Sequence, residues 1–275
     1  MRVLLFFIIG CFIWTCLSFV VKVIICSRFA IKKNQHHASH PLKIILGIFG
    51  EFVSVAAAIL LYPFGIFNSS VKPQAKLNKK RKGVLLIHGY IHNRSMLIPM
   101  KYYLRRRGVE NVFDITLSPP FASIEHFAGL ISAKVKEIKS CGIEEIDMVC
   151  HSMGGIAARY YAANSPDAGV IGNIITIGSP HLGTALAGLH IGRCCGEMKT
   201  GSSFLKDLNE KRLPGNIKMF SIWSTFDNII LPPENSIAPG SKEISFDYIG
   251  HIALVFSQSV LNKVYELIKE KDKEN

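Results

Sequence analysis

From residue 84 onward, the chain alternates short, continuous apolar runs with longer segments of helical spacing. Uninterrupted apolar runs of this kind are typical of strands that are buried on both faces. Strands separated by helices pair in parallel through right-handed crossovers. The sequence therefore predicts an α/β fold, with a mostly parallel sheet of about six strands flanked by helices. The expected strands are 84–87, 112–117, 146–150, 173–177, 218–224 and 242–248, and the expected helices are 95–107, 124–139, 156–163 and 252–269.

Two longer apolar runs precede this region, at 3–25 and 44–67, and each contains a single charged residue, Lys22 or Glu51. At ~1.5 Å per residue, either run is long enough as a helix to cross a hydrocarbon core of about 30 Å. A cleaved signal peptide is the alternative for the first run, but its apolar part exceeds the usual ~7–15 residues. A carboxylate is costly in lipid, so Glu51 is expected to face a partner helix or the membrane interface.

These runs divide the sequence into an anchor (1–70), a basic linker (71–82) and a folded domain (83–275). Residues 1–82 carry a net charge of +11, whereas residues 83–275 carry +1. A folded part so nearly neutral argues against a nucleic-acid-binding face. Basic residues that flank apolar runs instead suit anionic lipid head groups. Seven basic residues on the domain's side of the two spans, against four in the loop between them, favour a cytoplasmic domain.

The segment Cys150-His151-Ser152-Met153-Gly154 follows the third expected strand and precedes a helix. This is the setting of the nucleophile elbow Gly-x-Ser-x-Gly, in which a sharp turn exposes the serine hydroxyl and small neighbours let strand and helix approach. Cysteine replaces the first glycine here. Cys150 and His151 should point to opposite faces of a strand, so a thiol–imidazole pair is not expected. A plain helix N-cap would explain the serine but not the glycines at 154 and 155.

A nucleophilic serine needs a histidine base and an acid, which follow in the order Ser, Asp or Glu, His in this fold. Asp227 comes just after the fifth expected strand, and His251 lies between the sixth strand and the last helix. Ligands of such sheets bind at the carboxyl ends of the strands, so both are well placed. Asp247 is a rival acid, but it falls within the expected strand and close to His251. We therefore predict a catalytic triad of Ser152, Asp227 and His251.

An oxyanion must also be stabilised when the serine attacks a carbonyl group, and backbone N–H groups are the natural donors. The fold would supply them from the residue after the nucleophile, Met153, and from the loop after the first strand, at Tyr90. His88 in that loop is expected to stabilise it by hydrogen bonding. No dinucleotide or phosphate-binding glycine motif is present, so no cofactor is predicted. Cys194 and Cys195 lack the second ligand pair that a metal site would need.

Five segments in this order resemble the small bacterial triacylglycerol lipases of the α/β-hydrolase superfamily, and they are similar also to membrane-bound GPI inositol-deacylase relatives. They are 86–90, 149–155, 176–184, 224–232 and 250–254. The resemblance implies hydrolysis of carboxylic esters by Ser152, His251 and Asp227, with Tyr90 and Met153 at the oxyanion positions. The two leading spans predict a membrane location, in a bacterial inner membrane. The secreted members lack such spans, which leaves the native substrate open.

Lipid esters are the expected substrates of a domain tethered near a bilayer. A phospholipase, thioesterase or acyltransferase with the same triad is an alternative, and a non-catalytic membrane scaffold is another. Residues 185–205 include an apolar segment that forms either a short lid or acyl-chain wall at the site, or an ordinary surface helix. The oligomeric state is left open.

Overall fold

The structure is a computed structural model that describes residues 2–28, 40–66, 82–189 and 191–273. Most of the basic linker predicted at 71–82 lies outside the described residues. Its last residue, Lys82, begins the first strand, where its ammonium group lies 2.9 Å from the buried carboxylate of Asp147.

Six parallel strands form one sheet in the order β2-β1-β3-β4-β5-β6. All six predicted strands are confirmed, although β2 and β6 each end two residues earlier than predicted. The strands are β1 (Lys82–Ile87), β2 (Val112–Ile115), β3 (Glu145–His151), β4 (Ile171–Ile177), β5 (Lys218–Ser224) and β6 (Lys242–Phe246). The topology is that of a three-layer α/β fold whose carboxyl ends meet at one edge, here called the carboxyl edge.

The helices of the main domain also follow the predicted pattern, with local differences. They are α3 (Ile98–Arg106), α4 (Ile124–Ser140), α5 (Met153–Asn164), α6 (Arg193–Glu197), α7 (Ser203–Glu210) and α8 (Gln258–Lys273). The α5 helix begins three residues earlier than predicted, because the turn at Ser152 leads into it directly. The last predicted helix is two elements, a short 3₁₀ turn (Ala253–Val255) and α8. Sequence periodicity did not predict α6 and α7, which are too short to show it.

Local signals explain where α4 begins and ends. The Ser123 side chain accepts a hydrogen bond from the backbone N–H of His126, as an N-cap does. Gly142 follows the helix with φ of +81°, and its N–H donates to the Lys139 carbonyl. A left-handed glycine at this position closes the last turn of a helix.

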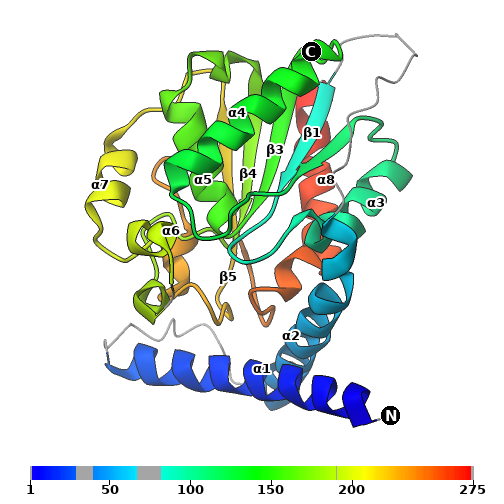
Figure 1. Ribbon diagram of the computed structural model, residues 1–275, viewed down its shortest axis with the longest axis vertical. Coiled ribbons are helices and arrows are strands. Elements are labelled where there is room, and N and C mark those ends of the chain that lie inside the picture. Colours follow the sequence, from blue (N-terminus) through cyan, green and yellow to red (C-terminus); the bar gives the residue numbers. More distant parts are fainter. Residues whose placement is uncertain (1, 29–39, 67–81, 190, 274–275) are drawn as a thin grey trace.

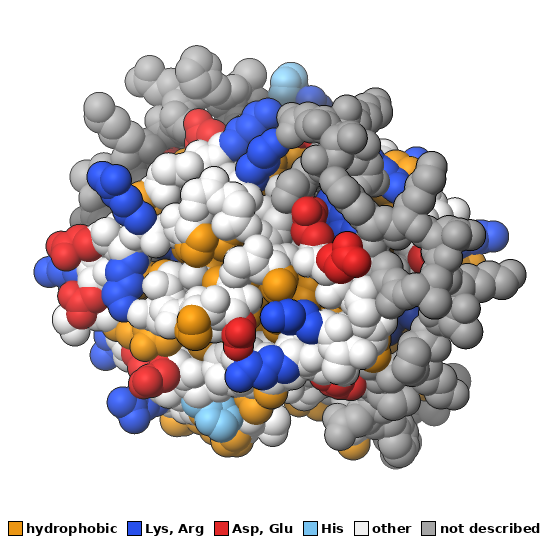
Figure 2. All heavy atoms as spheres, turned by 90° about the horizontal axis from the view of Figure 1, so that it is seen from above, with side chains coloured by type: hydrophobic (Ala, Val, Ile, Leu, Met, Phe, Trp, Pro, Cys, Tyr) orange, Lys and Arg blue, Asp and Glu red, His pale blue; other side chains and the backbone are white. Residues whose placement is uncertain are grey.

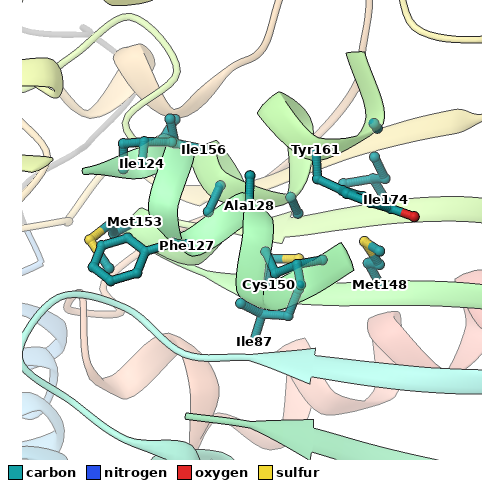
Figure 3. Packing of buried hydrophobic residues seen from close by; sticks show 14 of the residues in the cluster. Ile87, Ile124, Phe127, Ala128, Met148, Cys150, Met153, Ile156, Tyr161 and Ile174 are labelled. Carbon is teal, nitrogen blue, oxygen red and sulfur yellow. The ribbon is translucent and has the colours of Figure 1, made fainter. Parts of the chain in front are cut away.

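The core consists of two apolar layers, one on each face of the sheet. Alternate strand residues point to opposite faces, so Leu85 and Ile87 pack under α4 and α5, whereas Val84 and Leu86 pack against α3 and α8. Figure 3 shows the first layer, in which Cys150 lies among Ile87, Met148 and the side chains of α4 and α5. The two layers hold the strands rigidly and thereby fix the carboxyl edge.

Two apolar helices, α1 (Arg2–Arg28) and α2 (Pro41–Leu61), lie at one end of the molecule. Figure 1 shows α1 running across the end to which the carboxyl edge points, and α2 rising beside the domain. The segments Leu5–Ser27 and Pro41–Gly65 are long and apolar enough to cross a membrane. Figure 2 shows the opposite end, where basic and acidic side chains are interspersed.

The expectation that Glu51 faces a partner helix or the membrane interface is wrong. Its carboxylate is 1% exposed and accepts hydrogen bonds from the backbone N–H groups of Ile252 and Ala253 in the main domain. The reason is tertiary: α2 packs on the loop that follows β6. The charge therefore meets backbone donors instead of lipid.

Candidate active site

Ser152 occupies a tight turn between β3 and α5. Its backbone has φ of +53° and ψ of −127°, a left-handed conformation that a non-glycine residue rarely adopts. Its N–H donates to the carbonyl of Ile177 at the end of β4, and its own carbonyl accepts the N–H of Gly155. Strain of this kind costs about 1–3 kcal/mol and persists only where the surroundings hold it. The turn is therefore the strained strand-to-helix elbow expected for a nucleophilic serine.

Glycines around Ser152 allow this turn because neighbouring segments touch it on several sides. A Cβ at Gly154 would lie 2.5 Å from the carbonyl oxygen of His88, and a Cβ at Gly155 would lie 2.1 Å from Ser179 Oγ. On the other side, a Cβ at Gly89 would lie 2.8 Å from Ser152 Cβ. All three positions lack room for any side chain, which explains the paired glycines after the serine.

The predicted acid and base are in contact. His251 Nδ1–H donates to Asp227 Oδ2 over 2.8 Å, and both side chains are buried. The other oxygen of Asp227 accepts the backbone N–H groups of Ile229 and Ile230, at 2.8 and 2.9 Å. Three donors thus hold the carboxylate in place and orient it toward the imidazole. Because Nδ1 carries the proton in this bond, Nε2 is the nitrogen left to act as a base.

Burial by itself lowers the pKa of His251, but the carboxylates of Asp227 and Glu51 outweigh it, so the pKa lies above the usual histidine value. Negative charge beside an imidazole stabilises its protonated form. These carboxylates would therefore stabilise an imidazolium at His251.

Two residues next to Ser152 or its backbone partner contact the His251–Asp227 pair. The ring of His151, the neighbour of Ser152, lies 4.7 Å from the ring of His251, centroid to centroid. The Ser152 N–H donates to the carbonyl of Ile177. The next residue, Gly178, packs closely on the pair: a Cβ there would lie 3.2 Å from both Asp227 Oδ2 and His251 Nδ1. The three predicted triad residues therefore converge at the carboxyl edge, from the ends of β3, β5 and β6.

Tyr90 and Met153 flank the serine from two sides. Met153 is the first residue of α5, where a backbone N–H has no partner within the helix. Tyr90 follows Gly89, whose backbone touches Ser152 as described above. The Tyr90 hydroxyl donates to the carbonyl of Ile191, which fastens its loop across the site. The oxyanion role of the Tyr90 and Met153 N–H groups stays a prediction.

Three other residues weighed from the sequence are engaged elsewhere. His88 Nε2 accepts the N–H of Leu117, and its Nδ1–H donates to the Gly89 carbonyl. Burial lowers the pKa of His88 to about 4, so it is a neutral group that holds the loop by hydrogen bonds. Burial raises the pKa of the Cys150 thiol far above its usual range. Asp247 lies after β6 and accepts a hydrogen bond from Thr225. Among the described residues, no cluster of three His, Cys, Asp or Glu side chains could hold a metal ion.

One residue of the site was missed by the sequence reasoning. Asn228 is buried, and its Oδ1 accepts the backbone N–H of His251 over 2.9 Å. Its position directly after Asp227 was the available signal, but an asparagine in a turn is too common to single out.

Exposed apolar side chains surround the site, here called the apolar rim. They follow β1, β2 and β4 and comprise Ile91, Phe121, Leu182, Leu189 and Ile191. Residues 185–189 form a 3₁₀ turn within the segment weighed from the sequence as a lid or a surface helix. Backbone bonds from Arg193 and Cys194 to the Phe121–Ala122 segment tie this region to the domain. The rim is exposed apolar surface on the loops that follow these strands.

Comparison with known proteins finds similar sequences and folds. Residues 123–253, a range that contains Ser152, Asp227 and His251, match the family described as a PGAP1-like alpha/beta domain. The mature lipase BlEst2 of Bacillus licheniformis is similar in fold, with a TM-score of 0.63 at 15% identity over 72% of this chain and 95% of that one.

Two structures from metagenomic sources are similar as well. One is of the lipolytic enzymes LipS and LipT, with a TM-score of 0.55 at 15% identity over 70% of this chain and 94% of that one. The other is the carboxyl esterase MGS0156, with a TM-score of 0.55 at 13% identity over 71% and 77%. The sheet and these likenesses agree: the chain has an α/β-hydrolase-like fold, as these lipases and esterases do.

Proposed function

We propose that the protein is a membrane-anchored serine hydrolase that cleaves carboxylic esters, with lipid esters as its substrates. The observation that carries this proposal is the 2.8 Å bond between His251 and Asp227 beside a serine held at positive φ. A fold shared with lipases and esterases supports ester hydrolysis as the reaction class. The apolar rim and the two apolar helices at the same end of the molecule support a lipid substrate (Figure 1).

The mechanism has two steps of acyl transfer. His251 Nε2 takes the proton of Ser152 Oγ as that oxygen attacks the ester carbonyl, and the imidazolium then gives the proton to the departing alcohol. In the second step His251 takes a proton from water, the hydroxide attacks the acyl-enzyme, and Ser152 Oγ regains the proton. In both steps the backbone N–H groups of Tyr90 and Met153 would bind the oxyanion.

Labelling by a fluorophosphonate probe tests this proposal. The probe reacts only with an activated serine, so wild-type protein in membranes should be labelled, whereas Ser152→Ala should not and His251→Ala should lose labelling by about 10⁴-fold or more. Absence of labelling in folded wild type would overturn the proposal in favour of a scaffold. A panel of acylglycerols, phospholipids and thioesters then assigns the acyl substrate, and preference for short soluble esters over every lipid dispersion would contradict the lipid assignment.

A further inference from the structure

The loop that carries His251 is held by side chains from distant parts of the chain. Three successive backbone N–H groups donate to them: that of His251 to Asn228 Oδ1 at 2.9 Å, that of Ile252 to Glu51 Oε1 at 3.0 Å, and that of Ala253 to Glu51 Oε2 at 2.8 Å. Two of the three acceptors therefore belong to a single carboxylate on α2. Hydrogen bonds to an ionised acceptor are about twice as strong as neutral ones.

Glu51 can contact this loop because glycines at two positions leave room for the close approach. A Cβ at Gly250 would lie 2.4 Å from Glu51 Oε2, and a Cβ at Gly47 would lie 2.6 Å from the Tyr248 carbonyl oxygen. The α2 helix thus touches the loop at both ends of one helical turn. A buried carboxyl group is costly unless it is hydrogen-bonded, so the two N–H donors explain how Glu51 is accommodated in an otherwise apolar helix.

The α1 helix reaches the same two loops. Ser18 Oγ accepts a hydrogen bond of 2.8 Å from Asn228 Nδ2, so the amide that holds the His251 N–H is itself held by α1. Lys22 Nζ donates to the Thr225 carbonyl at 3.1 Å, two residues before Asp227. The N-terminal helices therefore contact the loops of both the predicted acid and the predicted base.

We propose that Glu51 is a positioning residue for His251, so that the apolar N-terminal helices form part of the catalytic unit as well as the anchor. The inference rests on the proposed serine-hydrolase function. Glu51 holds the His251 loop through its two backbone bonds, and it adds negative charge near the imidazole. The other titratable groups that face His251 are Asp227, His151 and His92, and Lys22 lies near Asp227.

The test uses the full-length protein in detergent, with hydrolysis of a soluble p-nitrophenyl ester measured against pH. Glu51→Ala should lower kcat by about 10- to 100-fold with KM little changed, because a small displacement of a catalytic group is enough for such a loss. Glu51→Gln keeps one acceptor, so its kcat should fall less. The midpoint of its pH profile should move down, because the charge that raises the pKa of His251 is gone.

Ser54→Ala is the matched control. Ser54 is buried on the same face of α2, one turn further on, and its hydroxyl bonds only within the helix, to the Gly50 carbonyl. This variant should keep the wild-type rate and midpoint. Tryptophan fluorescence during thermal unfolding shows whether each variant is folded.

The outcomes separate this inference from the proposed function. If Ser152-dependent labelling is absent from wild type, the function itself fails. If wild type is labelled but folded Glu51→Gln retains both the wild-type rate and the wild-type midpoint, only the positioning role is overturned. If both Glu51 variants lose activity only in proportion to the fraction of protein that is unfolded, Glu51 has a purely structural role. That result would also overturn the positioning role.

Discussion

At the scale of single residues, the site depends on a few positions where the backbone or a charge is held against its ordinary preference. Ser152 adopts positive φ because its neighbours have no side chains to obstruct the turn. His251 is buried, which lowers its pKa, and yet the carboxylates that face it raise the pKa above the usual histidine value. Each feature would be unfavourable alone and is stabilised by named partners.

Replacement of Gly154 by alanine tests the first feature. Its added Cβ would meet the His88 carbonyl at 2.5 Å and the Ile87 carbonyl at 2.9 Å, both of them backbone atoms that cannot easily shift. We expect a loss of about 1–3 kcal/mol in the free energy of unfolding, measured by denaturant titration, together with loss of probe labelling. Gly169→Ala is the control, since nothing lies within 4 Å of its Cβ position. A Gly154→Ala protein with wild-type stability and labelling would contradict the account of the elbow.

Replacement of Asp227 by asparagine tests the second feature. In wild type kcat/KM should rise with pH as His251 loses its proton, with a midpoint above the usual histidine pKa. Asp227→Asn removes the nearest charge that raises this pKa, so the midpoint should fall, and the rate should drop by about 10⁴-fold because the imidazole is no longer held in the right tautomer. A pH–rate profile for each protein decides the matter, and an unchanged midpoint would exclude Asp227 as the partner of the base.

At the scale of elements, the site is assembled from loops at the ends of parallel strands. The predicted triad residues come from the ends of β3, β5 and β6, whereas the apolar rim follows β1, β2 and β4. In the proposed function, the rigid strands would hold the triad, and the longer loops would present apolar surface to the substrate.

A change in the rim should alter substrate preference and leave the chemistry intact. Leu189 and Ile191 are 75% and 77% exposed, so substitution of both by serine costs the fold little. We expect hydrolysis of an emulsified long-chain ester to fall several-fold, while that of a soluble short-chain ester stays at the wild-type level. Tyr102→Ser on α3, another exposed apolar position, is the control. Equal effects on both substrates would show that the rim does not select lipid.

At the scale of the whole molecule, the two apolar helices lie at the end that holds the site. Their exposed apolar side chains are of the kind that lipid covers, while Ser18 and Glu51 face the domain. The opposite end carries mixed charges (Figure 2). This polarity suits a protein whose site faces a bilayer.

Membrane extraction tests this arrangement. Apolar helices of this length should keep the full-length protein in the membrane pellet after alkaline carbonate treatment. If the domain is cytoplasmic, as the basic residues favour, protease added to intact bacterial spheroplasts should leave it uncut, and permeabilised cells should not protect it. Release of the protein by carbonate would argue against an anchor, and cleavage in intact spheroplasts would reverse the orientation.

The sequence by itself determined the six-stranded parallel sheet, because buried strands and amphipathic helices leave local patterns of apolar residues. It also identified Ser152, Asp227 and His251 as candidates, because each follows a strand and parallel strands end at one edge. The positions of Glu51 and Asn228 beside His251 were decided only by the tertiary structure. Their partners are backbone N–H groups, which every residue but proline carries and no sequence pattern marks. The same holds for the α2 helix: its apolar composition predicts burial in lipid or protein alike, and only packing against the His251 loop distinguishes its two faces.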